Sequence, residues 1–221
     1  VTSTGAGLSV PDWPLSYGMV FPPMVGNVRF EHGHRMVATT VGLLTIGLAI
    51  WLQRREERQR VRRLGWLALA AVVLQGLLGG LTVLLLLPPA VSVAHACLGQ
   101  TFFCITLAIA LLTSPGWRHA PPPIPAPAAG LTLRQAAVAT TVAVFLQLVL
   151  GALMRHTGAG LAIPDFPLSL GRLVPPLDTP AVPIHLAHRL GGVAVALLGL
   201  AAAGRVLARH RAEPLLVRPA L

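Results

Sequence analysis

The sequence predicts an all-α membrane protein, a polytopic bundle of transmembrane helices built from two repeated units. Of the 221 residues, 54% are hydrophobic and only 11% are charged, and the mean hydropathy is +0.72. An average soluble domain has a charged share of about 25%. Apolar runs of the length needed to span a bilayer, about 20 residues, recur at 35–53, 64–87, 91–113, 135–154 and 184–204. These runs are too long for strands, so a large soluble core is the weaker interpretation.

Each run is rich in Leu, Val and Ala, with interspersed Gly and almost no charge. Between the third and fourth runs, the stretch PGWRHAPPPIPAPAAG at 115–130 favours an extended linker, because its prolines disfavour a packed helix. We therefore expect three regions, a first helical unit, a cytoplasmic linker and a second helical unit: 1–114, 115–134 and 135–221.

Arginines are unevenly distributed among the connections. The Arg-rich connections contain Arg54, Arg55, Arg58, Arg60, Arg62, Arg63, Arg118, Arg134, Arg205, Arg209, Arg211 and Arg218. The alternate connections contain only Arg29, Arg155 and Arg172. By the positive-inside rule the Arg-rich side is cytoplasmic, which predicts a multi-pass protein of the bacterial plasma membrane. The net charge of +10 follows this topology, so no nucleic-acid partner is expected.

One polar loop occurs twice. TGAGLSVPDWPLSYG at 4–18 returns as TGAGLAIPDFPLSLG at 157–171. Extended to Met24 and Leu177, the two copies are identical at 13 of 21 positions. Both loops are predicted on the outer side, and each leads into an apolar helix. We therefore expect two similar four-helix units, of which this chain, as a fragment, contains about helices 2–6 of eight.

Polar residues at the outer edge of these helices are candidate functional residues, because a membrane makes an unpaired polar group costly. Glu31, His34 and Arg35 are spaced i, i+3, i+4, and they share one helix face if the helix extends that far. The second copy repeats this spacing with His185, His188 and Arg189. Three histidines are then expected at similar depth near the outer face: His34, His95 and His188.

Histidines at equal depth in a helical bundle can bind heme iron, because two imidazoles supply both axial ligands. Arg35 and Arg189 are candidates for binding the propionates, since a guanidinium fork matches a carboxylate. Zinc is the less favoured metal, because it needs three or four close ligands. Cys97 and Cys104 are about 10 Å apart along one helix, too far for a disulfide, and are interpreted as buried apolar residues.

The combined pattern resembles the heme A synthase family over essentially the whole chain. The pattern is TGAGL-x-x-PD-[WF]-P in an outer loop, E-x-x-HR at a helix start, a histidine two helices later and a second HR helix. The resemblance implies an eight-helix oxidoreductase that oxidises the C8 methyl group of heme O to a formyl group, giving heme A, and that binds heme b as cofactor. It implies that Glu31 is the acidic residue beside the catalytic heme, that His34 and His95 are the first-unit histidine pair, and that His188 is one axial ligand of heme b.

The resemblance also implies heme O as the substrate, handed over by a heme O synthase, and an electron acceptor that the sequence does not identify. A homo-oligomer is one possible assembly. The first unit has Glu31 where the second has His185, and a carboxylate at a heme edge can accept protons during methyl oxidation. The sequence departs from the family in two respects. The histidine expected on an eighth helix is absent, so we expect the fragment alone to be inactive, and the outer loops lack the cysteine pair of some relatives.

Two other function classes fit less well. A bis-histidine electron-transfer cytochrome needs the histidines but neither Glu31 nor a loop over each unit. A repeat-built transporter needs polar residues near the middle of the membrane, where Gln75, Gln100 and Gln147 are almost the only candidates.

Two interpretations of the repeated loop also stay open. It is a lid over a heme pocket, or its aspartates, Asp12 and Asp165, cap turns while Trp13 and Phe166 anchor in the headgroup region.

Overall fold

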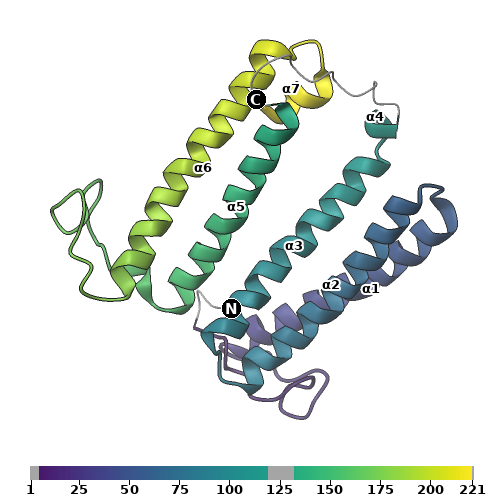
Figure 1. Ribbon diagram of the computed structural model, residues 1–221. Coiled ribbons are helices and arrows are strands. Elements are labelled where there is room, and N and C mark those ends of the chain that lie inside the picture. The colour runs from purple at the N-terminus through teal and green to yellow at the C-terminus, as the bar shows by residue number, and fades with distance from the viewer. Residues whose placement is uncertain (1–4, 119–131, 221) are drawn as a thin grey trace. The chain divides into compact units, whose positions relative to one another are not determined.

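The computed structural model describes residues 5–118 and 132–220, and there it is helical, with two isolated β-bridges and no longer strand. Five helices are long and apolar enough to cross a membrane (Figure 1). They are α1 (Val28–Arg55), α2 (Gln59–Leu84), α3 (Pro89–Thr113), α5 (Leu133–His156) and α6 (Ala181–Arg209). The predicted all-α polytopic fold is therefore confirmed.

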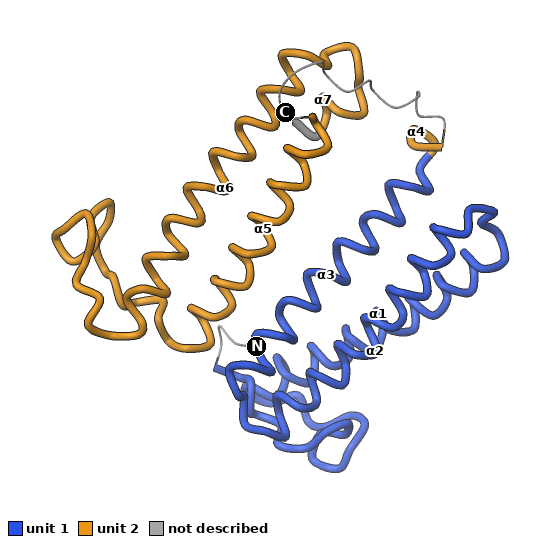
Figure 2. Tube along the Cα trace, viewed as in Figure 1, with its two compact units in different colours: residues 1–114 blue, residues 115–221 orange. Residues whose placement is uncertain are grey.

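The chain forms two compact units, residues 1–114 and 115–221, which Figure 2 colours separately. The second unit also contains three short helices: α4 (Pro115–Arg118), the 3₁₀ turn η2 (Ala159–Leu161) and α7 (Pro214–Ala220). Of the predicted extended linker, residues 119–131 lie outside the described residues.

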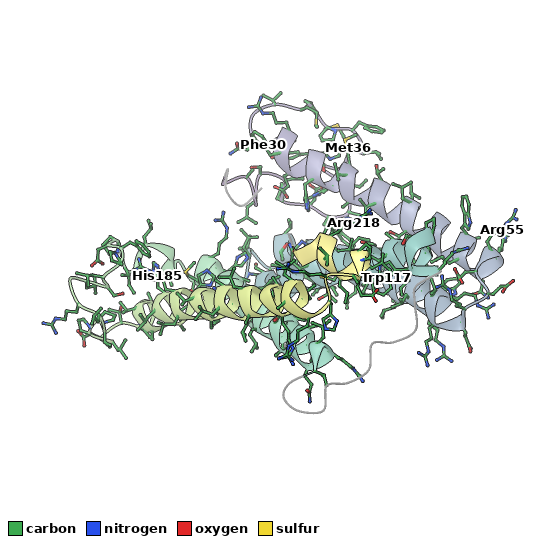
Figure 3. The ribbon with its side chains drawn as sticks, turned by 90° about the horizontal axis from the view of Figure 1, so that it is seen from above. Phe30, Met36, Arg55, Trp117, His185 and Arg218 are labelled. Carbon is green, nitrogen blue, oxygen red and sulfur yellow. The ribbon has the colours of Figure 1, made fainter. Side chains whose placement is uncertain are left out.

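The membrane helices begin earlier than the apolar runs predict. α1 begins at Val28, so Glu31, His34 and Arg35 lie within its first turns. Hydropathy detects only the hydrocarbon-spanning part of a helix, whereas the backbone continues helical into the polar layer. In Figure 3, Phe30 lies near the loop end of α1 and Arg55 at its other end.

In the first unit α2 packs against both α1 and α3, and in the second α5 packs against α6. A small residue permits the close approach of α1 and α2, because a Cβ on Gly65 would lie only 2.9 Å from Cδ1 of Leu52. The core cluster there consists of Leu52, Val61, Ala68 and Ile109. Many other large apolar side chains on the helices are exposed, as expected for surfaces that meet lipid or neighbouring helices.

Helix ends follow the local sequence. Pro89 occupies the first turn of α3, where its missing N–H has no helical partner to lose. Thr132 and Gln135 form a capping box at the start of α5, in which the N–H of Gln135 donates to Oγ1 of Thr132 at 3.1 Å. At the α1–α2 turn, Arg58 forms an ion pair with Glu56 and donates to the carbonyl of Leu112 at 2.9 Å, which ties this turn to the end of α3.

Candidate functional site

The loops that precede α1 and α6 contain the same tight hairpin turn. In the first unit, Ser16 and Met19 exchange backbone hydrogen bonds at 2.9 and 3.0 Å. The central residues Tyr17 and Gly18 have φ of 54° and 69°, as a type I′ turn requires. The carboxylate of Asp12 accepts both central N–H groups, at 2.7 and 2.8 Å. These two hydrogen bonds offset the strain of a left-handed tyrosine.

The second loop repeats this turn. Its central residues Leu170 and Gly171 have φ of 54° and 73°, and Asp165 accepts their N–H groups at 2.7 and 2.8 Å. Both aspartates therefore cap turns. This capping does not exclude the interpretation of the loop as a lid, because a loop that closes over a heme pocket must also be held in one conformation.

These hydrogen bonds lower the pKa of both aspartates. The N–H groups of Gly18 and then Tyr17 hold the pKa of Asp12 below its usual value of 3.8, and Gly171 and Leu170 act likewise on Asp165. A carboxyl group with a lowered pKa stabilises the fold at a pH above its ordinary value. This stabilisation is lost only as the pH falls through the lowered pKa.

We expect hydrogen exchange at the amides of Tyr17 and Gly18 to stay protected from neutral pH down to roughly pH 4 and to lose protection only below it. In Asp12→Asn, both amides should exchange faster at every pH, because an amide side chain offers one acceptor oxygen for two donors. Mass spectrometry of exchange, corrected for intrinsic rates, measures the effect. The intact turn at Asp165 is the internal control. Loss of protection in the unmodified protein between pH 7 and 5 would contradict the assignment.

A buried ion pair fixes the first loop to α1. Glu31 is 3% exposed, and its Oε1 lies 2.9 Å from a guanidinium nitrogen of Arg35. Its Oε2 accepts the N–H of Val10 at 2.9 Å. Arg35 also donates to loop carbonyls, those of Asp12 and Leu15 at 2.7 Å each and that of Val10 at 3.2 Å. We call this arrangement the first loop clamp.

The second loop is held by an equivalent set in which histidine replaces the carboxylate. Arg189 donates to the carbonyls of Ile163 at 2.8 Å and Leu168 at 3.0 Å. Its Nε donates to Nε2 of His185 at 3.1 Å. Nδ1 of His185 lies 3.1 Å from the carbonyl oxygen of Ala159 and 3.3 Å from the backbone nitrogen of Ile163. This second loop clamp lies at the loop end of α6, where Figure 3 labels His185.

The two clamps match residue by residue, with His185 in the place of Glu31 and Arg189 in the place of Arg35. His185 is neutral in this arrangement, because its Nε2 accepts the Nε–H of Arg189 and therefore carries no proton. The first clamp thus contains an ion pair, whereas the second contains a neutral acceptor. The sequence predicts that both arginines bind heme propionates. In the structure both donate hydrogen bonds to backbone carbonyls of the loops.

The three predicted histidine ligands occupy corresponding places in their helices. His34 and His95 are the seventh residues of α1 and α3, and His188 is the eighth residue of α6. His95 and His188 are half-buried against the neighbouring helix, whereas His34 is exposed. The structure therefore places His95 and His188 in helix pairs, α2–α3 and α5–α6, and it leaves the ring of His34 open.

His32 is a buried residue that the sequence interpretation missed. Its Nδ1 lies 2.8 Å from the hydroxyl of Ser16, which links α1 to the first loop. The repeat drew attention to His34 because that residue aligns with His188, while His32 has no histidine counterpart. The sequence did contain a signal for His32, because FEHGHRM has two histidines, and either of them is a candidate functional residue.

The loop aromatics differ between the units. Trp13 packs against α2, since a Cβ on Gly80 would lie 2.5 Å from its indole ring. Its counterpart Phe166 is 87% exposed. The two residues therefore do not share one role within this structure.

The donor set suits heme better than a metal held by side chains alone. Across residues 5–118 and 132–220, no three His, Cys, Asp or Glu side chains converge on one point. Zinc needs such a cluster. Porphyrin already supplies four nitrogens to its iron, so heme needs only one or two axial imidazoles from separate helices. His95 and His188 on apolar helix pairs fit this requirement.

Fold and site together define a polytopic helical membrane protein with two clamped loops and a histidine beside each. The chain belongs to the COX15-CtaA family of cytochrome oxidase assembly proteins, which matches residues 26–221. This confirms the resemblance seen in the sequence.

Among its relatives is the heme A synthase of Symbiobacterium thermophilum, 34% identical over 206 residues that cover 90% of this chain and 66% of the relative. The heme A synthases of Shouchella clausii and Halalkalibacterium halodurans are 31% and 32% identical, over 90% and 89% of this chain and 66% and 65% of the relatives. The chain thus spans about two thirds of the length of these relatives. No solved structure matches it.

Proposed function

We propose that this chain acts in heme A biosynthesis and belongs to an enzyme that oxidises heme O. The observation that carries the proposal is the repeated placement of a half-buried histidine, His95 or His188, in a two-helix hairpin close to a clamped loop. Single imidazoles on apolar helices suit an iron whose other ligands come from a porphyrin. The named relatives, all heme A synthases, support the same activity.

In this proposal His34 and His95 bind heme O in the first unit, and its C8 methyl group is oxidised to a formyl group, with the oxygen atom supplied by water or dioxygen and the four electrons passed to an external electron acceptor. His188 would hold heme b in the second unit. Heme b, when bound, supplies one-electron redox chemistry. Arg35 and Arg189 close the outer loops over the two sites, and this closure keeps water from them. The Arg-rich helix ends lie in the cytoplasm and the loops outside it.

Glu31 has two candidate roles in this scheme. It holds the first loop through Arg35 and Val10, and it is the acidic group that accepts protons during oxidation of the methyl group. Opening of the loop would free the carboxylate for the second role. The second unit lacks a carboxylate at this position, as suits a unit that only carries electrons.

The test uses the product of the natural gene in a host that makes heme O but no heme A. We expect heme A in the extracted hemes, and at least a tenfold loss of bound heme in His95→Ala and His188→Ala. Bound heme b without heme A would favour the bis-histidine cytochrome. Absence of any heme in the purified, folded protein would contradict both functions.

Glu31→Gln separates the two roles of Glu31 in the same host. Loss of heme A while the loop stays resistant to protease indicates the proton-accepting role. Loss of heme A together with an open loop indicates that Glu31 acts through the clamp. Unchanged heme A formation would exclude both roles.

A further inference from the structure

A second repeat, distinct from the loops, pairs a glutamine with each half-buried histidine. LQGLLG at 74–79 lies in α2, and LQLVLG at 146–151 lies in α5. The following membrane helix contains HACLG at 95–99 in α3, or HRLGG at 188–192 in α6. Each hairpin therefore has a Gln-x-x-x-Gly helix facing a helix in which a glycine follows the histidine by three or four residues.

The glycine of the first helix makes room for the histidine ring. A Cβ on Gly79 would lie 3.1 Å from Cε1 of His95, 3.7 Å from Nδ1 and 3.9 Å from Nε2. A Cβ on Gly151 would lie 2.9, 3.5 and 3.8 Å from the same atoms of His188. The order of the atoms is the same and the distances agree closely, so the two imidazoles lie in the same way against the corresponding glycines of the two units.

The glycine of the second helix makes room for the glutamine in the same way. A Cβ on Gly99 would lie 2.9 Å from Nε2 of Gln75, and a Cβ on Gly191 would overlap Oε1 of Gln147. No larger residue fits at Gly191 without displacing the amide. In each hairpin the histidine therefore lies against a glycine of the first helix, and the glutamine lies against a glycine of the second helix.

The contact is closest in the second unit. Nε2 of Gln147 lies 3.0 Å from Nδ1 of His188 and donates to the His188 carbonyl at 2.7 Å. Among the described residues no donor reaches the buried Oε1 of Gln147. A buried acceptor without a partner costs about 1–3 kcal/mol. In the first unit Nε2 of Gln75 lies 3.4 Å from Nε2 of His95.

We propose that Gln147 is the positioning residue of the heme ligand His188; Gln75 lies beside the other ring nitrogen of His95, so the inference is confined to the second unit. The inference rests on the proposed function, in which these histidines bind heme iron. In the structure the amide donates to Nδ1 of His188, which places the imidazole proton on Nε2. A histidine that binds metal through Nε2 carries its proton on Nδ1 and donates it to a partner.

Rotation of the Gln147 side-chain amide by half a turn would provide the acceptor that a proton on Nδ1 of His188 requires. It brings Oε1 to the position facing Nδ1, where the oxygen gains the donor that it lacks. The amide then gives up its bond to the His188 carbonyl and must shift away from it, because the two oxygens would otherwise lie 2.7 Å apart; that carbonyl lies inside α6 and keeps its intrahelical partner. Gln147 therefore sets both the tautomer and the orientation of the ring.

The experiment measures heme affinity and the reduction potential of the bound heme in the product of the natural gene, for Gln147→Leu, Gln147→Glu and the control Gln100→Leu. Gln100 lies on α3 with an exposed side chain. We expect Gln147→Leu to weaken heme binding about 10–100-fold. Gln147→Glu should retain heme at a lower potential, because a carboxylate makes the imidazole more electron-rich. Gln100→Leu should match the unmodified protein.

The outcomes separate this inference from the proposed function. If the unmodified protein binds no low-spin heme, the proposed function fails. If it does, while both Gln147 variants keep its affinity and its potential, the positioning role alone is wrong. A purely structural role would lower the thermal stability of Gln147→Leu and leave the potential of Gln147→Glu unchanged, which would also overturn the inference.

Discussion

Replacing Arg35 by alanine should open the first loop and destabilise the first unit by about 3–5 kcal/mol, the usual cost of removing one partner of a buried ion pair. Without Arg35, the 3%-exposed carboxylate of Glu31 loses its only ion-pair partner among the described residues. The carbonyls of Val10, Asp12 and Leu15 lose their donor at the same time. Thermal unfolding in detergent and chymotrypsin cleavage after Tyr17 measure the two effects.

Two other arginines serve as matched controls. Arg189→Ala should cost less than Arg35→Ala, because it leaves the neutral ring of His185 rather than a buried charge. Arg29 lies 4.8 Å above the ring of Phe30 at the exposed start of α1, so Arg29→Ala should cost at most about 1 kcal/mol. Equal effects of Arg35→Ala and Arg189→Ala would show that the ion pair is not what distinguishes the clamps.

The number and type of the helices could be predicted because the length of an apolar run depends only on consecutive residues of the sequence. All five predicted runs lie almost wholly within observed helices, and α3 ends at the predicted residue, Thr113. The start of α1 was less accurate, since Val28 precedes the apolar run by seven residues. The polar residues Glu31 and Arg35 are compatible with a helix there because each has its partner in the folded loop.

The partners of the site residues were less accessible to sequence reasoning. Spacing placed Glu31 and Arg35 on one helix face, but it did not indicate that Val10, 21 residues away, donates to the carboxylate. A guanidinium is equally suited to a propionate and to a set of backbone carbonyls. Only the folded loop supplies the carbonyls in the required geometry.

Gln75 and Gln147 show that the role of a polar residue can be interpreted only when its contacts are known. In the sequence, Gln75 and Gln147 are isolated polar residues in apolar runs, and by themselves they indicate at most a transporter. In the structure each amide lies beside a histidine and against a glycine of the facing helix. The two Gln-x-x-x-Gly segments were visible in the sequence, but helix pairing was needed to connect them with His95 and His188.

Replacing Gly151 by alanine should cost more than tenfold in heme affinity while leaving α5 as stable as before or more so. Alanine is the better helix former by about 1 kcal/mol. The new methyl group, however, would lie 2.9 Å from Cε1 of His188, a distance that atoms do not tolerate. The imidazole is the end of a flexible side chain, so we expect the ring to move away and lose its contact with Gln147 rather than the helices to separate.

Gly199→Ala is the matched control, because Gly199 lies within α6 and a Cβ added there would meet no atom within 4 Å. It should raise helix stability by a similar amount and leave heme binding unchanged. Heme titration and thermal unfolding of the two variants together give the result. If Gly151→Ala binds heme as well as Gly199→Ala does, the imidazole position seen against Gly151 is not the one that heme requires. The ligand role of His188 would then need a different ring orientation.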